Sequence, residues 1–197
     1  MTVISVIVGS TREGRFSEKP AKWILQHLKK RNGVDARLLD LRDFPLPFFN
    51  EPIPPAMPGR PPYKNEVVQR WTAAIAQSDG FVFVTPEYNY GPPAVLKNAI
   101  DWVYPEWNRK AAGFVSYGSA MGARGVQQLR LTAIEVQLAP ISIVGPHPCG
   151  NPVGSLSRRR CRCRAGGARG ARWGYDRRSA VVDCRLEDGA RGRVAGR

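Results

Sequence analysis

The chain has 197 residues and a formal net charge of +14, with 30 Lys and Arg against 16 Asp and Glu. This length suffices for one domain with a hydrophobic core of its own, and it excludes a small scaffold that depends on disulfides. No stretch approaches the roughly 20 apolar residues that span a bilayer, and the chain opens directly on a strand-like segment, residues 3–8. We therefore expect a cytoplasmic protein with no signal peptide and no membrane partner.

The positive charge and the cysteines are concentrated at the end of the chain. Residues 149–197 hold 13 Arg, four acidic residues and all four Cys, so +9 of the net charge lies there. The Cys spacing matches no common zinc motif, and we expect no metal site. The change of composition predicts a folded domain over residues 1–145 and a disordered Arg- and Gly-rich tail over residues 146–197.

The first part of the chain alternates between strand and helix patterns. The apolar run over residues 3–8 predicts a strand buried on both faces. An apolar stripe over residues 21–28 predicts a helix, with Ser17 as its N-cap. Residues 34–38 alternate between apolar and charged side chains, which predicts a strand at the edge of the sheet.

Residues 43–62 contain eight of the 17 prolines, too many for a helix or a central strand. This segment is predicted to be a long functional loop, and a plain surface excursion is the alternative. The aromatic side chains of Phe44, Phe48 and Phe49 indicate that part of the loop packs against another part of the protein.

The pattern then repeats up to residue 144. Helices are expected near residues 67–75, 94–103 and 129–136, and strands over residues 81–84, 114–117 and 141–144. Such alternation implies an α/β fold with a parallel sheet and right-handed crossovers.

Three loops follow the predicted carboxyl ends of strands one, three and four, so they converge at one edge of the sheet, where open α/β sheets bind ligands. The first loop, residues 9–17, opens onto a helix N-terminus. Its possible phosphate ligands are the hydroxyls of Ser10, Thr11 and Ser17 and the guanidinium of Arg12 or Arg15. The loop is neither a Walker A motif nor a dinucleotide fingerprint. A helix-capping turn with exposed arginines is the alternative.

The other two loops carry a resemblance to a known family. Residues 86–93 read Pro-Glu-Tyr-Asn-Tyr-Gly-Pro-Pro and are followed by the segment 96–102, Leu-Lys-Asn-Ala-Ile-Asp-Trp. Together with residues 9–12 and 116–124, they resemble the three ordered signatures of the NADPH-dependent FMN reductase family.

The resemblance implies a flavodoxin-like, doubly wound, five-stranded sheet of order 2-1-3-4-5 that binds FMN noncovalently. It implies that Ser10, Arg12 and Ser17 hold the phosphate. On one side of the isoalloxazine ring it places Pro86, Glu87, Tyr88 and Asn89, and on the other side Tyr117, Gly118 and Ser119. No side chain is expected to be catalytic, because the flavin carries the chemistry.

The implied activity is that of an oxidoreductase, passing hydride from NADPH or NADH to FMN and on to a quinone, a flavin or a similar small acceptor. Two alternatives stay open: a flavin-binding electron carrier without its own nicotinamide site, and nucleic-acid binding through the basic tail. The family also implies a homodimer or homotetramer, so Trp102, Tyr104 and Trp107 belong either to the core or to a subunit interface.

Several polar residues have plainer interpretations. Glu87 could be a solvated loop carboxylate, and Lys97 and Asp101 are spaced for a helix ion pair. His27 is expected at the surface.

In the family a final helix follows the fifth strand, and the tail offers no apolar stripe that would form it. The tail's composition resembles an out-of-frame translation of GC-rich coding sequence. We therefore expect the final helix to be missing or replaced.

Overall fold

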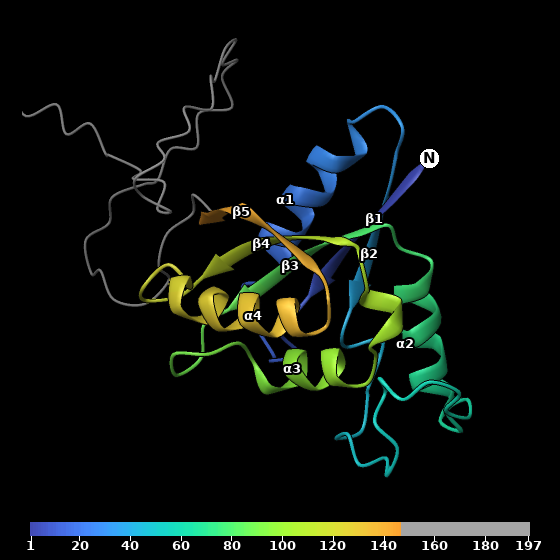
Figure 1. The fold of residues 1–197 in the computed structure, drawn as a ribbon. Helices are drawn as coiled ribbons and strands as arrows, with labels where there is room; N and C mark the ends of the chain where they lie inside the picture. Colours follow the sequence, from blue (N-terminus) through green and yellow to red (C-terminus); the bar gives the residue numbers. More distant parts are fainter. Residues whose placement is uncertain (147–197) are drawn as a thin grey trace, which may run out of the picture.

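Five strands alternate with four α-helices and one short 3-10 helix in the computed structural model, which describes residues 1–146 (Figure 1). The elements are β1 (Thr2–Val8), α1 (Glu18–Lys29), β2 (Val34–Asp40), α2 (Glu66–Ala76), β3 (Gly80–Pro86), α3 (Ala94–Asp101), η1 (Pro105–Trp107), β4 (Ala111–Tyr117), α4 (Ala123–Glu135) and β5 (Ala139–Pro146). The predicted disordered tail, apart from Pro146, and the expected loss of a final helix lie outside the described residues.

The strands form one parallel sheet of order β2-β1-β3-β4-β5. This confirms the predicted doubly wound topology, with β2 at the edge. Val8 at the end of β1 pairs with Val84 in β3, and Thr85 pairs with Ser116 in β4. The carboxyl ends of these three strands therefore meet at the same edge of the sheet.

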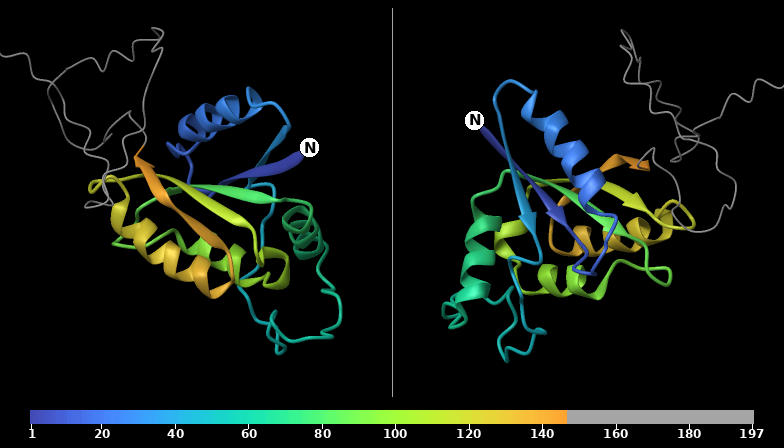
Figure 2. Two further views of the ribbon diagram at one scale, coloured as in Figure 1. Left: turned by 45° about the horizontal axis from the view of Figure 1, so that its top comes forward. Right: turned by 180° about the vertical axis from the view of Figure 1, so that it is seen from behind.

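The two faces of the sheet are covered by different helices. Helix α1 lies on one face, and α2, α3 and α4 lie on the other (Figure 2). The α1 face has a small core that includes Val6, Val8 and Ala21, and the opposite face has a larger aromatic core. Because helices cover both faces, β1 and β3 are continuous apolar runs rather than alternating ones.

Three tryptophans dominate the larger core. Trp71, Trp102 and Trp107 are each fully buried, and each indole N–H donates to a backbone carbonyl at 2.7–3.2 Å. A buried indole needs such a partner to avoid an unsatisfied polar group. Trp102 and Trp107 are thus core residues within this chain, whereas Tyr104 is only partly buried.

The loop over residues 43–62 has no regular structure, as predicted, but it is anchored. The Phe44 ring packs edge-on against the Trp71 ring, with 5.2 Å between the ring centroids. The Phe49 amide donates a hydrogen bond to Asn98 Oδ1 at 2.9 Å. Phe48 is 78% exposed. The prediction that part of the loop packs is therefore confirmed through Phe44 and Phe49, and Phe48 takes no part in that packing.

Smaller predictions have mixed outcomes. Lys97 Nζ binds Asp101 Oδ1 at 2.7 Å, which confirms the helix ion pair, and His27 is exposed, as expected. Ser17 does precede α1, but its side chain caps no helix N–H. Within residues 1–146, no helix is both long and apolar enough to cross a bilayer.

Candidate functional site

The three predicted loops meet beyond the carboxyl ends of β1, β3 and β4. The Ser10 and Tyr88 hydroxyls are hydrogen-bonded at 3.0 Å, and those of Ser17 and Tyr117 at 2.5 Å. The Glu87 amide donates to the Tyr117 carbonyl at 2.9 Å. The β1–α1 loop is therefore joined by side chains to both other loops.

The two serines of the β1–α1 loop are buried. Ser10 is 1% exposed and Ser17 is not exposed at all. The Ser17 hydroxyl binds Tyr117 instead of capping α1, which explains why the expected side-chain cap is absent. The Ser17 hydroxyl therefore lies at the N-terminus of α1, where backbone N–H groups and the helix dipole favour an anion.

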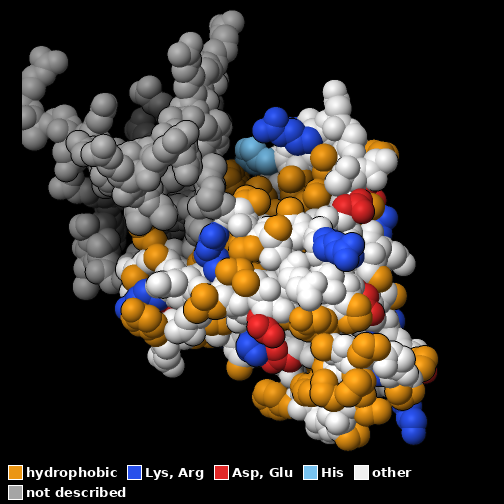
Figure 3. Space-filling model, in the orientation of Figure 1, with side chains coloured by type: hydrophobic (Ala, Val, Ile, Leu, Met, Phe, Trp, Pro, Cys, Tyr) orange, Lys and Arg blue, Asp and Glu red, His pale blue; other side chains and the backbone are white. Residues whose placement is uncertain are grey.

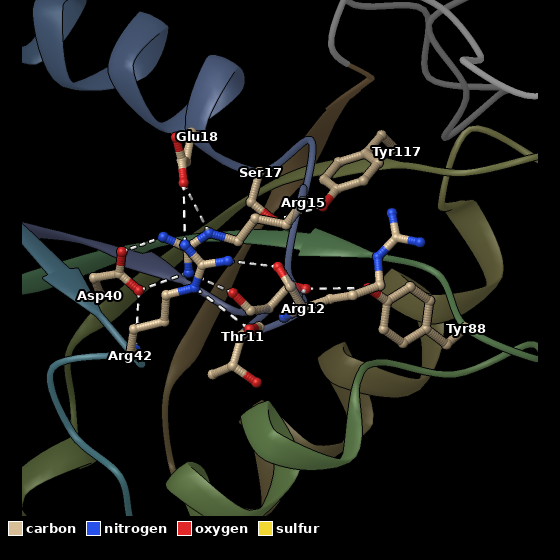
Figure 4. A network of polar contacts seen from close by, with 10 residues as sticks. Thr11, Arg12, Arg15, Ser17, Glu18, Asp40, Arg42, Tyr88 and Tyr117 are labelled. Atoms are coloured by element: carbon tan, nitrogen blue, oxygen red, sulfur yellow. Dashed lines mark hydrogen bonds and ion pairs between the residues drawn. The ribbon is translucent and has the colours of Figure 1, made fainter.

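The two arginines of this loop have different surroundings (Figure 4). Arg15 is buried, and Nη1 donates to Asp40 Oδ1 at 2.7 Å and to the Ser10 carbonyl at 2.5 Å, while Nη2 pairs with the other Asp40 oxygen. Arg12 is exposed and makes no side-chain hydrogen bond or ion pair within the described part of the chain. Its guanidinium extends toward the rings of Tyr88 and Tyr117 (Figure 4).

The Arg15–Asp40 pair braces the loop against the end of β2. Burial alone raises the pKa of Asp40, but hydrogen bonds from Arg15 and from the Arg42 amide outweigh it and hold the pKa below its ordinary value. Arg42 adds a second brace, since its Nη2 donates to the Arg12 carbonyl at 2.6 Å. The β1–α1 loop is therefore held by two charged residues at the carboxyl end of β2, Asp40 in the strand and Arg42 just after it.

Sequence reasoning missed both Asp40 and Arg42. A signal was present, because Asp40 and Arg42 alternate with Leu39 and Leu41 just after the carboxyl end of the predicted strand, residues 34–38. A pocket of about 340 Å³ lies next to this brace and is lined by Thr11, Leu41, Arg42, Phe44, Pro45, Leu46, Val95 and Asn98. Thr11 is its only lining residue among those predicted for the site.

The β3–α3 loop begins with a tight two-residue turn. Tyr88 and Gly91 exchange backbone hydrogen bonds at 2.9 and 3.0 Å, and Asn89 and Tyr90 between them have φ of 48° and 74°. This is the backbone of a type I′ turn. A left-handed tyrosine costs about 1–2 kcal/mol, and Tyr90 is partly held by the Arg124 guanidinium, 4.8 Å from its ring.

Glu87 is neither solvated nor free. Its side chain is 2% exposed, and its carboxylate accepts from the Arg124 and Gly125 amides and from Arg124 Nε. Burial by itself raises the pKa of Glu87, but the Arg124 hydrogen bond and the backbone donors lower it below its ordinary value. The interpretation as a solvated loop carboxylate is wrong.

The β4–α4 loop depends on small residues. Gly122 has φ of 74°, and a Cβ there would lie 2.6 Å from Ser116 Cβ and 2.7 Å from the Tyr117 amide. Gly118 and Ser119 lie in the chain between Tyr117 and Gly122, and the side chain of Ser119 is exposed. Burial raises the pKa of Tyr117 despite its hydrogen bond to Ser17, so its hydroxyl stays protonated at neutral pH.

The arrangement suits binding rather than nucleophilic catalysis. The three loops contain no Cys or His, and the buried hydroxyls of Ser10 and Ser17 are bonded to tyrosines rather than to a general base. One end offers hydroxyls, helix N–H groups and the exposed Arg12 guanidinium, which are donors for a phosphate. The other end offers backbone groups of two close loops, which suit the polar edge of a flat ring.

Comparisons with known proteins agree with this geometry. The sequence profile described as NADPH-dependent FMN reductase matches residues 2–144. An NAD(P)H-dependent FMN reductase of Schizosaccharomyces pombe is 42% identical over 139 residues, which cover 70% of this chain and 69% of that protein. An NAD(P)H:quinone oxidoreductase of Solanum tuberosum is 33% identical over 139 residues, which cover 68% of this chain and 68% of that protein.

Solved structures show the same fold. The flavoenzyme NAD(P)H:(acceptor) oxidoreductase FerB of Paracoccus denitrificans superimposes with a TM-score of 0.55 at 30% identity, over 72% of this chain and 75% of that one. The expected family resemblance and the flavodoxin-like fold are therefore confirmed. This chain belongs to the NADPH-dependent FMN reductase family.

Proposed function

We propose that this protein is an FMN-dependent NAD(P)H oxidoreductase that reduces a quinone, a flavin or a similar small acceptor. Family membership and the quinone oxidoreductase among its relatives support this activity. The observation that carries the proposal is the meeting of three loops around the buried Ser10 and Ser17 hydroxyls. When bound, FMN would take hydride from the nicotinamide and pass reducing equivalents to the acceptor.

The phosphate of FMN would bind at the β1–α1 loop. Each buried serine hydroxyl can donate one hydrogen bond and accept others, so Ser10 and Ser17 can bind phosphate oxygens while they stay bonded to tyrosine hydroxyls. Thr11 and Arg12 are exposed beside them, and Arg12 would supply the positive charge. Arg15 would act indirectly, by bracing the loop on Asp40.

The ring of FMN would lie between the other two loops. Pro86 to Asn89 would border one side and Tyr117 to Ser119 the other. The Glu87 carboxylate is held by Arg124, so Glu87 would contact the ring through its backbone rather than its side chain. The protein would hold the ring at a fixed distance from the nicotinamide and exclude water, while the flavin supplies the redox chemistry.

We further propose a cytoplasmic homodimer or homotetramer. Apolar side chains gather at the surface over the 43–62 loop (Figure 3), among them Phe48, Ile53 and Met57. Leu131 and Ile134 add exposed apolar area on α4. Apolar surface of this kind is typical of interaction sites, and the cytoplasm supplies the NAD(P)H that the reaction consumes.

Reduction of bound flavin by NADPH tests the activity. Under anaerobic conditions the flavin absorbance of the full chain loaded with FMN should bleach on addition of NADPH or NADH, and a quinone should restore it. A flavin that is bound but not bleached by either nucleotide would instead indicate an electron carrier. Nucleic-acid binding depends on the tail, which lies outside residues 1–146.

A further inference from the structure

The Glu87 carboxylate joins two loops that are far apart in the chain. It lies at the start of the β3–α3 loop, and it accepts hydrogen bonds from the backbone amides of Arg124 at 3.0 Å and Gly125 at 3.2 Å, in the first turn of α4. Arg124 Nε donates to the other carboxylate oxygen at 2.6 Å, and Nη2 pairs with the same oxygen. Both oxygens are therefore satisfied by α4.

Close packing surrounds this contact. A Cβ at Gly125 would lie 3.1 Å from the Gly91 carbonyl and 3.4 Å from Glu87 Cα. A Cβ at Gly118 would lie 3.1 Å from Glu87 Cβ. The β3–α3 loop, the β4–α4 loop and α4 therefore approach closely at Glu87, and a side chain at either glycine would force its neighbours to move by a few tenths of an ångström.

Arg124 extends the contact to the turn. Its guanidinium lies 4.8 Å from the Tyr90 ring while it binds Glu87. Asn89 and Tyr90 both have left-handed backbones, a conformation that persists in non-glycine residues only where neighbouring contacts maintain it. Arg124 is one such contact.

We propose that Glu87 and Arg124 are positioning residues that lock the β3–α3 loop to α4 and so set the width of the slot for the flavin ring. The sequence motif suggested that Glu87 borders the flavin, and its carboxylate is instead directed into the protein. The part of this inference that concerns the slot rests on the proposed function. The lock itself is a property of the chain without cofactor.

The lock requires an anion at position 87. Two of its donors are backbone amides at a helix N-terminus, where a negative charge is favoured, and these donors remain whatever residue replaces Arg124. Exchanging the charges, as E87R/R124E, would place a guanidinium against two N–H groups. A simple ion pair would survive the exchange, whereas this lock would not.

Amide hydrogen exchange on the full chain without FMN tests the lock. In E87Q the new amide NH₂ opposes N–H donors, so segments 86–92 and 117–126 should both exchange about tenfold faster or more than in wild type, because their local opening becomes easier. E87R/R124E should show at least the same acceleration. D101N removes an exposed carboxylate of α3 that is likewise paired with a cation, and should leave both segments unchanged.

Several outcomes would overturn the inference. They are unchanged exchange in E87Q, acceleration confined to the first turn of α4, or wild-type exchange in E87R/R124E. If E87Q does not fold, R124Q replaces it, because the two backbone donors to Glu87 remain. R124Q should then accelerate exchange mainly in segment 86–92, and no acceleration there would reject the role of Arg124.

FMN affinity then links the lock to the slot. At a temperature where each variant is fully folded, E87Q should raise the dissociation constant for FMN about tenfold, and D101N should not change it. If E87Q lowers the melting temperature but leaves the dissociation constant unchanged, the lock is structural only. If wild type itself binds no FMN, the proposed function fails, while hydrogen exchange still decides whether the lock exists.

Discussion

The hydroxyls of Ser17 and Tyr117 lie 2.5 Å apart and connect the start of α1 with the end of β4, one hundred positions along the chain. This bond closes the β1–α1 loop over the carboxyl edge of the sheet. It also places the proposed phosphate donors next to the loop that would border the ring.

Removing the Tyr117 hydroxyl should destabilise the fold. Y117F leaves the buried Ser17 hydroxyl without its partner, and an unsatisfied buried hydroxyl costs about 1–3 kcal/mol. Y90F serves as the control, because Tyr90 is 55% exposed. Urea unfolding should show a lower free energy of unfolding for Y117F than for Y90F, and equal values would show that the bond contributes nothing.

Arg12 and Arg15 should have separable effects. R12Q should raise the dissociation constant for FMN about tenfold or more, since a hydrogen bond between charged groups contributes about 1.5–3 kcal/mol. It should not change the affinity for riboflavin, which lacks the phosphate. Fluorescence titration with both ligands measures this. A matched loss for riboflavin would argue against a phosphate contact.

R15Q should instead act on stability. The substitution removes the guanidinium that is paired with the Asp40 carboxylate. Removing one partner of a buried ion pair lowers the free energy of unfolding by about 3 kcal/mol. Its free energy of unfolding should therefore fall well below that of R12Q in the same urea series. R15Q as stable as R12Q would mean that the Arg15–Asp40 brace contributes little.

The Asp40 carboxylate should make stability depend on pH. Arg15 holds its pKa below the ordinary value, so the folded state binds a proton less tightly than the unfolded state. The stabilisation is complete above the ordinary carboxyl pKa of about 4 and is lost as the pH falls toward the lowered pKa. The deficit of D40N relative to wild type should be largest at pH 7 and shrink below pH 4, and a deficit that grows in acid would contradict this.

Gly122 offers a test of the β4–α4 loop. G122A combines a positive φ with a Cβ that collides with Ser116 and the Tyr117 amide. At Gly14, φ is also positive, at 61°, but nothing lies within 4 Å of the added Cβ. G14A should therefore show only the conformational penalty of about 1 kcal/mol, and G122A a larger loss of unfolding free energy. Similar losses would mean that the loop relaxes around the added methyl group.

The positions of the loops were predictable, but the partners of their side chains were not. Apolar runs such as residues 3–8 and 81–84 mark buried strands, and the loops that follow them must meet at one edge of a parallel sheet. Arg15 and Asp40 are 25 positions apart, and Glu87 and Arg124 are 37 apart. Such pairs arise from tertiary packing, which no local pattern records.

Partners that are distant in sequence also explain where the structure differs from the sequence-based expectations. Ser17 has the right residue type and position for an N-cap, and the competing Tyr117 hydroxyl comes from a distant strand. Phe48 resembles its neighbours Phe44 and Phe49 in sequence, yet its side chain is exposed, although Asn98 binds the backbone on both sides of it, at Pro47 and Phe49.

Titration of the full chain with FMN, followed by flavin fluorescence and visible absorbance, tests the central claim most directly. Three loops that form a flavin site should bind one FMN per chain with saturable changes in both signals. R12Q should shift the midpoint to higher FMN concentration. An absence of any saturable change in wild type, with the protein shown to be folded, would contradict the assignment of these loops as an FMN site.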